Sequence, residues 1–387
     1  MKNLIDKINE NKEYVINLRR YFHENPELSW EEVNTSKRIR KELEEMNIPY
    51  ELVKDIGVIG HIKGKGEGKR LGIRADIDAL PVKEETGLSF ASKNEGVMHA
   101  CGHDAHISIL LGAAKILNEL KDEFKGEILI IFQPAEEYIQ DSGAKYLSQV
   151  PEIKSLDRII GLHIWGDIDS GSASLNEGPI MASADTFDIY IKGISGHGAS
   201  PHKSIDPIVA GSMVVNALQT IVSRENDPLE PQVISVTAFN SGNSKNVIPE
   251  TAHLEGTTRS FNNDLRSKYK SEMQRVLEGV AITTRAEIKL DYHDGTPATV
   301  NEKESTEMGI EVAKEVFKDG FIEDYPQLMG GEDFAKYLLN IPGCFLLLGG
   351  AGKKGKIAQH NEKFDIDEDA LKLGVEYFVK YAIKYLK

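Results

Sequence analysis

The sequence predicts an α/β fold in which a larger α/β metal-binding catalytic domain is interrupted by a small inserted ferredoxin-like (βαββαβ) domain. Three observations predict it. Short apolar runs at 71–77, 127–132 and 159–164 alternate with helical patterns, as in an α/β layer structure. Between about 186 and 292 the order of strands and helices changes. Stretches rich in Gly, Pro or small residues, 177–185 and 293–301, flank that middle part.

The elements of the outer domain come first and last in the chain. Residues 3–22 have helical spacing, and Ser29-Trp30-Glu31-Glu32 matches a capping box before a second helix. The segment 107–120 is apolar almost all round, which is typical of a buried helix. Towards the carboxyl end, the pattern predicts further elements, namely a helix near 303–317, a strand at 344–350 and a helix near 368–386.

The middle of the chain reads as a complete small domain. Alternation at 186–193 predicts a strand, and Asp206-Pro207 begins a helix that continues to about 225. Two strands, a helix and a last strand follow, at about 233–240, 250–258, 262–283 and 288–292. The order is β-α-β-β-α-β, that of a ferredoxin-like domain. We therefore expect residues 1–182 and 295–387 to form one domain and 183–294 to form a lid or dimerisation domain inserted into it.

Composition excludes several classes of protein. A chain of 387 residues usually forms more than one domain. Its 46 basic and 61 acidic residues give a net charge of −15, which repels phosphate backbones and anionic lipid, so we expect neither a nucleic acid nor a membrane as partner. Two cysteines are no disulfide framework, and no apolar run has the length of a signal peptide or membrane span. A cytoplasmic location is expected.

Five side chains at or beside predicted strand ends form a candidate metal site. Cys101 and His103 are two apart, so in an extended segment they point the same way. Glu137 follows a predicted strand that a proline ends, His163 lies in an apolar strand, and His360 follows a Gly- and Lys-rich loop. Taken singly, each suits a structural or surface role. Together they exceed the four ligands of a tetrahedral zinc ion and suit two ions of Zn, Mn, Co or Ni.

Two further carboxylates stand beside these candidates. Glu136 immediately precedes Glu137, and an unligated carboxylate there can take a proton from water; otherwise both belong to a solvated helix start. Asp78 lies in the stretch "RADIDAL", beside the end of a predicted strand. It is equally well interpreted as a solvated strand-end carboxylate or as the hydrogen-bond acceptor that orients a ligating histidine.

The inserted domain has a polar cluster of its own. His197 lies in the Gly-rich stretch "SGHGASPH", where the backbone can approach a ligand closely. Asn246 in "NVIPE" and Arg259 in "GTTRS" suit a substrate carboxylate, which a guanidinium binds with two hydrogen bonds. Each of the three, taken alone, is as well explained as a loop or surface residue.

Ten stretches occur in an order that resembles a known family. They are "RRYFHENPELSWEE", "RADIDALPVKEETGL", "MHACGHDAH", "FQPAEE", "GLHIW", "GHGASPH", "NVIPE", "GTTRSF", "MGGEDFA" and "QHNEKFDIDEDAL". From about residue 15 to the carboxyl terminus the chain resembles the amidohydrolase branch of the aminoacylase-type dinuclear metallopeptidase family. That branch includes hippurate hydrolases, auxin–amino acid conjugate hydrolases and N-acetyldiaminopimelate deacetylases.

The resemblance implies roles for the candidate residues. The metal ligands that it implies are Cys101, His103, Glu137, His163 and His360. It implies that Glu136 is the catalytic glutamate and that Asn246 and Arg259 bind substrate. It implies that His197 helps to hold the developing oxyanion, donated in dimeric relatives from the opposite subunit. Other branches have a His-x-Asp pair where this chain has Asp76-Ile77-Asp78, so the pairing of ligands with metals stays open.

The expected activity is metal-dependent hydrolysis of the amide bond of an N-acyl amino acid, with Glu136 as general base. A dipeptidase or carboxypeptidase with the same mechanism is the close alternative, and the partner is then a dipeptide. An amidase with Cys101 as nucleophile and a non-catalytic metal-containing binding protein are the rivals from other classes. A free edge strand of the inserted domain would also allow a homodimer.

Overall fold

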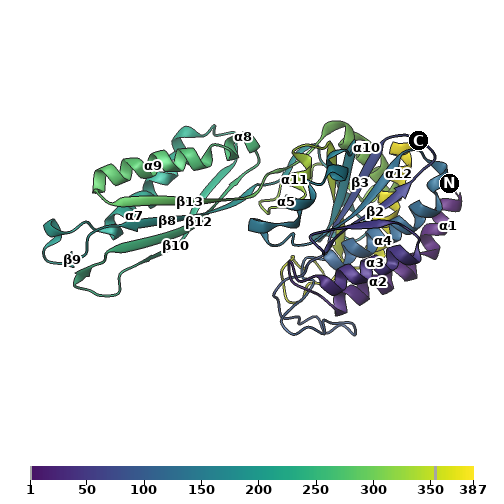
Figure 1. Cartoon of the computed structure of the whole chain (residues 1–387), viewed down its shortest axis with the longest axis horizontal. Coiled ribbons are helices and arrows are strands. Elements are labelled where there is room, and N and C mark those ends of the chain that lie inside the picture. The colour runs from purple at the N-terminus through teal and green to yellow at the C-terminus, as the bar shows by residue number, and fades with distance from the viewer. Residues whose placement is uncertain (1, 353–354) are drawn as a thin grey trace. The chain divides into compact units, whose positions relative to one another are not determined.

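The structure is a computed structural model that describes residues 2–352 and 355–387. It divides into two compact units (Figure 1). Unit 1 comprises the described residues of Met1–Gly178, Val300–Pro326 and Asp333–Lys387, and unit 2 comprises Pro179–Thr299 and Gln327–Glu332. Unit 2 is thus wider at both ends than the inserted domain expected at 183–294. It also takes in a return segment, 327–332, that the sequence pattern assigned to the outer domain. The chain passes between the units within β7 (Gly178–Met181) and β14 (Thr299–Asn301), and again at both ends of the return segment.

Unit 1 is built on a mixed sheet with eight strands in the described part of the chain, in the order β1-β2-β4-β3-β5-β16-β6-β15. The neighbours β4, β3, β5 and β16 run parallel and are almost wholly buried, which explains their continuous apolar sequences. The strands are β1 Tyr50–Val53, β2 Gly57–Lys63, β3 Arg70–Asp76, β4 Glu127–Gln133, β5 Arg158–Asp169, β6 Ala173–Ser174, β15 Phe321–Ile322 and β16 Gly343–Ala351.

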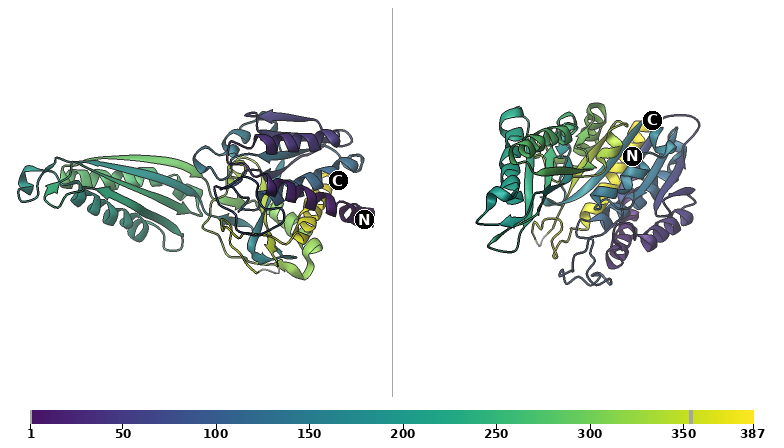
Figure 2. Two further views of the ribbon diagram at one scale, coloured as in Figure 1. Left: turned by 90° about the horizontal axis from the view of Figure 1, so that it is seen from below. Right: turned by 60° about the vertical axis from the view of Figure 1, so that its left-hand side comes forward.

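Helices pack against this sheet. The apolar helix α4 contacts β3 and lies beside α2 and α12, while α1 contacts α12, so the first and last helices lie together (Figure 2). None of the described helices combines the length and apolarity needed to cross a bilayer. The helices of unit 1 are α1 Lys2–Glu10, α2 Lys12–Glu24, α3 Val33–Glu45, α4 His103–Glu119, α5 Gly143–Leu147, α6 Pro151–Lys154, α10 Lys303–Phe317, α11 Ala335–Leu338 and α12 Asp369–Leu386.

Two local predictions for unit 1 were wrong. The single helix expected at 3–22 is divided at Asn11, which separates α1 from α2. The backbone N–H of Asn11 still donates to the carbonyl of Lys7, and its side-chain amide donates to the same oxygen, both at 3.1 Å. The capping box is also absent: α3 begins after Glu32, which makes no side-chain cap. The hydroxyl of Ser29 instead donates to Asp78 Oδ2 at 2.7 Å. A long-range polar contact has replaced the local one.

Unit 2 has the predicted βαββαβ order. Its four-stranded antiparallel sheet has the order β10-β12-β8-β13, that of a ferredoxin-like domain, and packs on two helices. The Asp206 side chain caps α7 as expected, accepting from two backbone N–H groups of the first turn. Its elements are β8 Ala184–Lys192, β9 Gly196–His197, α7 Pro207–Thr220, β10 Gln232–Ser241, β11 Val247–Ile248, β12 Thr251–Ser260, α8 Asn263–Arg266, α9 Tyr269–Thr284 and β13 Glu287–Thr296.

Candidate functional site

Left-handed backbone conformations occur at or next to candidate site residues in unit 1. Gly102 (φ 87°), Ala135 (φ 53°) and His360 (φ 65°) all have positive φ. At Gly102 an added Cβ would lie 2.4 Å from Cγ2 of Ile164, so only glycine fits there. The strained conformation of Ala135 is stabilised by a hydrogen bond from its N–H to Glu32 Oε1, at 2.7 Å. Such turns persist only when their surroundings hold them, and here they set the direction of the adjoining side chains.

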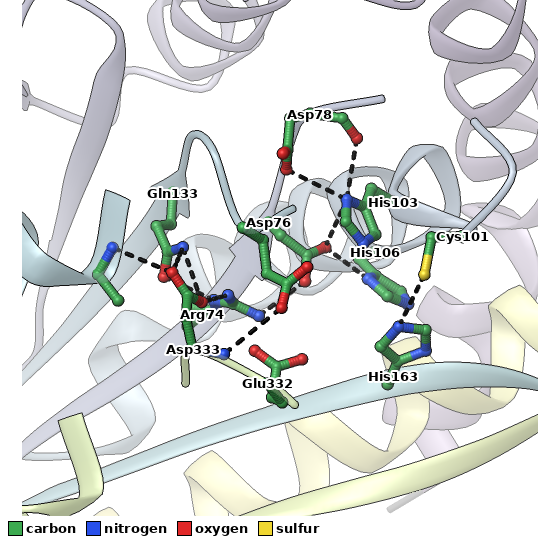
Figure 3. Close-up of polar contacts among 12 residues, drawn as sticks. Arg74, Asp76, Asp78, Cys101, His103, His106, Gln133, His163, Glu332 and Asp333 are labelled. Atoms are coloured by element: carbon green, nitrogen blue, oxygen red, sulfur yellow. Dashed lines mark hydrogen bonds and ion pairs between the residues drawn. The ribbon is translucent and has the colours of Figure 1, made fainter. Parts of the chain in front are cut away.

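The candidate ligands form two groups that share Cys101. In the first, the ligand atoms of Cys101, His103 and His163 lie within 4.8 Å of one another, and all three residues are buried. Cys101 Sγ is 3.4 Å from His163 Nε2 (Figure 3). In the second, Cys101, Glu137 and His360 meet the same criterion, with His360 Nε2 3.2 Å from Glu137 Oε1. All five residues named from the sequence therefore lie together in unit 1.

Hydrogen bonds to the backbone fix the tautomers of two histidines. His103 Nδ1 lies 2.9 Å from the carbonyl oxygen of Asp78, and His163 Nδ1 lies 2.7 Å from that of Ile164. A carbonyl only accepts, so each Nδ1 carries a hydrogen, and Nε2 is the nitrogen through which each ring can bind a metal ion. His103 Nε2 is buried and has no hydrogen-bond partner. A metal-binding imidazole usually donates one ring N–H to a protein oxygen and binds the metal through its other nitrogen.

His106 is close to both of these histidines but is differently engaged. Its Nδ1 lies 2.6 Å from Asp76 Oδ1, and its Nε2 accepts the backbone N–H of Ile164 at 2.8 Å. Both ring nitrogens are used, so His106 supports the site without a nitrogen to offer. Sequence reasoning gave it no role, although its place one helical turn after His103 on α4 was a usable signal.

A buried polar network adjoins the same groups. The Arg74 guanidinium donates to Asp76 Oδ2 at 2.7 Å, to Asp333 Oδ1 at 2.5 Å and to Gln133 Oε1 at 3.0 Å (Figure 3). The backbone N–H of Asp333 lies 3.4 Å from Glu136 Oε1. Sequence reasoning did not assign this network, although its members lie within the stretches "RADIDAL", "FQPAEE" and "MGGEDFA". The network connects the ends of β3 and β4 with the turn that carries Glu136.

Asp78 bridges several parts of the site. The sequence suggested that its carboxylate accepts from a ligating histidine; the bond from His103 goes to its main-chain oxygen, with the side-chain Oδ1 3.3 Å away. Its Oδ2 accepts from the Ser29 hydroxyl and, at 3.0 Å, from the backbone N–H of Glu137. Asp78 thus holds the backbone of one candidate ligand and the ring of another.

The electrostatics favour a bound cation. Burial, together with the nearby Glu137 and Glu136, raises the pKa of the Cys101 thiol well above its usual value. Burial acts to lower the pKa of His103, yet the carboxylates around it, Asp76 first among them, raise that pKa to about 10. Positive charge is therefore stabilised here. A nucleophilic thiol needs a lowered pKa, so these surroundings do not favour the Cys101 amidase.

The three candidates of unit 2 fall into two places. His197 in β9 pairs with Val247 in β11, and the carbonyl of Asn246 accepts the N–H of the residue after His197 at 2.8 Å, so these two are neighbours. Arg259 is next to the last residue of β12, and its guanidinium donates to the carbonyl of Thr258 at 2.8 Å. Thr251, at the end of β12 near His197 and Asn246, is eight residues from Arg259, which is about 27 Å in an extended strand.

Soft and borderline ligands gathered at the start of α4, in the turns that carry Glu137 and His360 and in the middle of β5, beside a carboxylate outside the Cys101 groups, define a metal-dependent hydrolase. Comparison with known proteins agrees. Residues 72–384 match the family described as Peptidase family M20/M25/M40. The chain belongs to this family, in its amidohydrolase branch.

Relatives cover nearly the whole chain. "Thermostable carboxypeptidase 1" of Saccharolobus solfataricus is 40% identical, covering 100% of this chain and 98% of its own. "N-acetylcysteine deacetylase" of Bacillus subtilis is 41% identical, covering 96% and 97%. A crystal structure of a Bacillus subtilis protein, described as a dinuclear metal-binding peptidase of the M20 family, has a TM-score of 0.84, 38% identity and coverage of 98% and 99%. The protein is thus a metal-dependent amidohydrolase or peptidase.

Proposed function

We propose that the protein hydrolyses the amide bond of N-acyl amino acids at a site for two divalent transition-metal ions, with Glu136 as the general base. One observation carries the assignment of the base. The Glu136 carboxylate lies within 4.8 Å of the ligand atoms of His103 and Glu137, yet it belongs to neither of the two groups built on Cys101. It is only 9% exposed. A carboxylate so placed is within reach of the reacting atoms without being consumed as a ligand of those groups.

The residues present fit the proposed ions. Cys101, His103 and His163 would hold one ion, and Cys101, Glu137 and His360 the other, because each set has its ligand atoms within 4.8 Å. The bare Nε2 of His103 supports this assignment. A thiolate with imidazoles and a carboxylate suits Zn, Mn, Co or Ni better than Mg or Ca. The Bacillus subtilis relative described as dinuclear supports the number two.

The protein's own residues then carry the proton. Two divalent ions, when bound, supply Lewis-acid polarisation of the amide carbonyl and acidify water. A carboxylate oxygen of Glu136 takes a proton from the attacking water. Protonated Glu136 then gives that proton to the amide nitrogen as the carbon–nitrogen bond breaks. The products are a free amino acid and a carboxylic acid. The Asp333 N–H, 3.4 Å from Glu136 Oε1, helps to orient the base.

The relatives and unit 2 support the proposed substrate class. A deacetylase relative and "IAA-amino acid hydrolase ILR1-like 2" of Arabidopsis thaliana, 39% identical over 97% of this chain and 86% of its own, support an N-acyl amino acid. Arg259 would bind the free carboxylate of that substrate. The carboxypeptidase relative supports peptide cleavage as a second candidate. Comparing kcat/KM for N-acetyl amino acids with that for matching dipeptides separates the two.

We also propose a homodimer formed through unit 2. His197 and Asn246 lie at one end of β12 and Arg259 at the other, so one small substrate cannot touch all three from a single chain. In the proposed dimer, Arg259 of one chain and His197 of its partner serve the same substrate, with His197 stabilising the developing oxyanion.

Substitution of the two neighbouring glutamates tests the base directly. Glu136→Gln should lower kcat by about 10²–10⁴-fold while metal content and KM stay near the wild-type values, because only proton transfer is lost. Glu137→Gln is the matched control: it should lower metal content, measured by plasma mass spectrometry, and activity should return with excess metal. Full activity in metal-loaded Glu136→Gln would refute the assignment.

A further inference from the structure

One face of the unit 2 sheet carries polar groups that the proposed function does not use. Side chains alternate along the strands. Phe187, Ile189 and Leu254 are buried in the core that includes α7 and α9, which lie beside each other (Figure 1). The intervening Asp188 and His253 project from the opposite face and are partly exposed. This face does not pack against the core, so packing does not explain which polar side chains it carries.

Three carboxylates lie side by side on this face. In the sheet register, Asp188 on β8 stands directly opposite Glu255 on β12 and Asp291 on β13. Directly opposed like charges destabilise a sheet. Among the described residues, no lysine or arginine forms an ion pair with any of the three, so no permanently charged basic side chain relieves their repulsion. The negative charge also acts on Tyr190, whose pKa is raised by Asp188 first of all.

Two imidazoles face the central carboxylate from either side. His253 Nε2 lies 2.6 Å from Asp188 Oδ1, and His293 Nε2 lies 3.1 Å from Asp188 Oδ2. The His253 ring stacks on Tyr190, with centroids 4.6 Å apart and planes 6° apart, which holds its Nε2 towards Asp188. The ligand atoms of Asp188, His253 and Glu255 lie within 4.8 Å of one another.

We propose that Asp188, His253 and Glu255, with His293 beside them, bind one divalent transition-metal ion on this face of unit 2. Imidazole nitrogen and carboxylate oxygen are typical ligands of Zn²⁺. Two ligands of one tetrahedral zinc ion lie about 3.3 Å apart. His293 Nε2, 3.1 Å from Asp188 Oδ2, is near that spacing, and His253 Nε2, 2.6 Å from Asp188 Oδ1, would move outward as the ion enters. The ion would neutralise the row of carboxylates. Because the residues are partly exposed, water completes the coordination. This site belongs to unit 2 alone and is independent of the proposed catalytic site.

The competing account is a cluster held by hydrogen bonds only, in which each imidazole donates Nε2–H to Asp188. Zinc binding distinguishes the two. Full-length protein is stripped with a chelator and equilibrated with Zn²⁺ by dialysis, and bound zinc per chain is measured by plasma mass spectrometry. We expect the His253→Gln/His293→Gln variant to bind one zinc ion fewer per chain than the wild type, and its hydrolytic activity to be unchanged.

The control is His202→Gln, an exposed histidine of the same unit, which should bind as much zinc as the wild type. The difference between the variants carries the test, so the result does not depend on how many ions unit 1 holds. Asp188→Asn, which keeps the size of the side chain, should lose the same ion, and both losses should remove a zinc-dependent rise in melting temperature. Equal zinc content in all these proteins would overturn the proposal and leave the hydrogen-bonded cluster.

Discussion

At the scale of single residues, the candidate site depends on what each ring nitrogen of its histidines contacts. His103 and His163 are held from behind by carbonyl oxygens, whereas His106 is held from both sides by Asp76 and a backbone N–H. These three histidines, whose rings lie within a few ångströms of one another, thus have two different roles. The role of each ring is set by the group that contacts its second nitrogen, and not by the distance between that ring and the other histidines.

Gly102 gives a residue-scale prediction. Its φ of 87° and the Ile164 methyl group, 2.4 Å from where a Cβ would lie, both exclude a side chain. Gly96 has a similar φ of 80° with nothing within 4 Å, so Gly96→Ala measures the backbone strain alone, about 1–2 kcal/mol. Gly102→Ala should lower the free energy of unfolding by more, and should also weaken metal binding because the flanking Cys101 and His103 move. Urea unfolding and metal titration measure both. Equal losses in the two variants would contradict this account.

At the scale of elements, strongly periodic segments were predictable and their ends were not. The order βαββαβ of unit 2 follows from alternation and one Asp-Pro cap, and the structure confirms it. In unit 1, α4 begins at His103 and not at 107, because Gly102 starts the helix in a left-handed conformation that no apolar pattern reveals. β5 likewise runs on to Asp169, beyond its apolar core. Ends set by long-range contacts cannot be read locally.

The candidate site, like the helices and strands, was predictable from the sequence only in part. Histidine, cysteine and adjacent glutamates at strand ends indicated the candidate ligands, because their chemistry is unusual in an apolar setting. The supporting network was not predictable, since Arg74 and Asp333 are far apart in the sequence and each alone resembles a surface residue. Their pairing in the buried interior depends on the register of β3 and the fold of the last third of the chain.

A second network, between helix α2 and the loop after β3, gives a prediction about pH. Glu84 Oε1 lies 3.3 Å from His23 Nε2, and its Oε2 accepts the N–H of Ser92 at 2.6 Å. Although burial acts in the opposite direction, these bonds lower the pKa of Glu84 to about 2. A lowered carboxyl pKa stabilises the folded state above the unfolded pKa, near 4.3, and this stabilisation is lost as pH falls towards 2.

Glu84→Gln removes that contribution. The free energy of unfolding should fall by on the order of 1 kcal/mol at pH 6, after allowance for solvent screening, and the difference from wild type should shrink as pH falls from about 5 to 3. Denaturant unfolding at several pH values measures it. The exposed neighbour Glu85→Gln is the matched control and should leave the pH profile unchanged. A difference that does not change with pH would show that Glu84 acts through packing only.

At the scale of the whole molecule, unit 2 is inserted between two parts of the chain that both contribute to the unit 1 site. Cys101, Glu137 and His163 precede the insertion, and His360 follows it. The candidate centre therefore forms only when the part of the chain that follows the insertion has packed onto β5, through the parallel pairing of β16. Loss of that last part should remove His360 and also the support that Asp333 gives to Arg74.

The proposed sharing of sites between two chains gives the last prediction. His197→Ala and Arg259→Ala should each be nearly inactive alone, because every site in either homodimer lacks one group. When the two inactive variants are unfolded together, refolded and reloaded with metal, half of the dimers are mixed, and each mixed dimer has one site with both groups intact. Activity should then return to about a quarter of the wild-type value. The control is each variant refolded alone, which should stay inactive. If His197 and Arg259 of one chain serve the same site, every site in the mixture lacks one of them and no activity returns. That result would refute sharing while leaving the Glu136 assignment untouched.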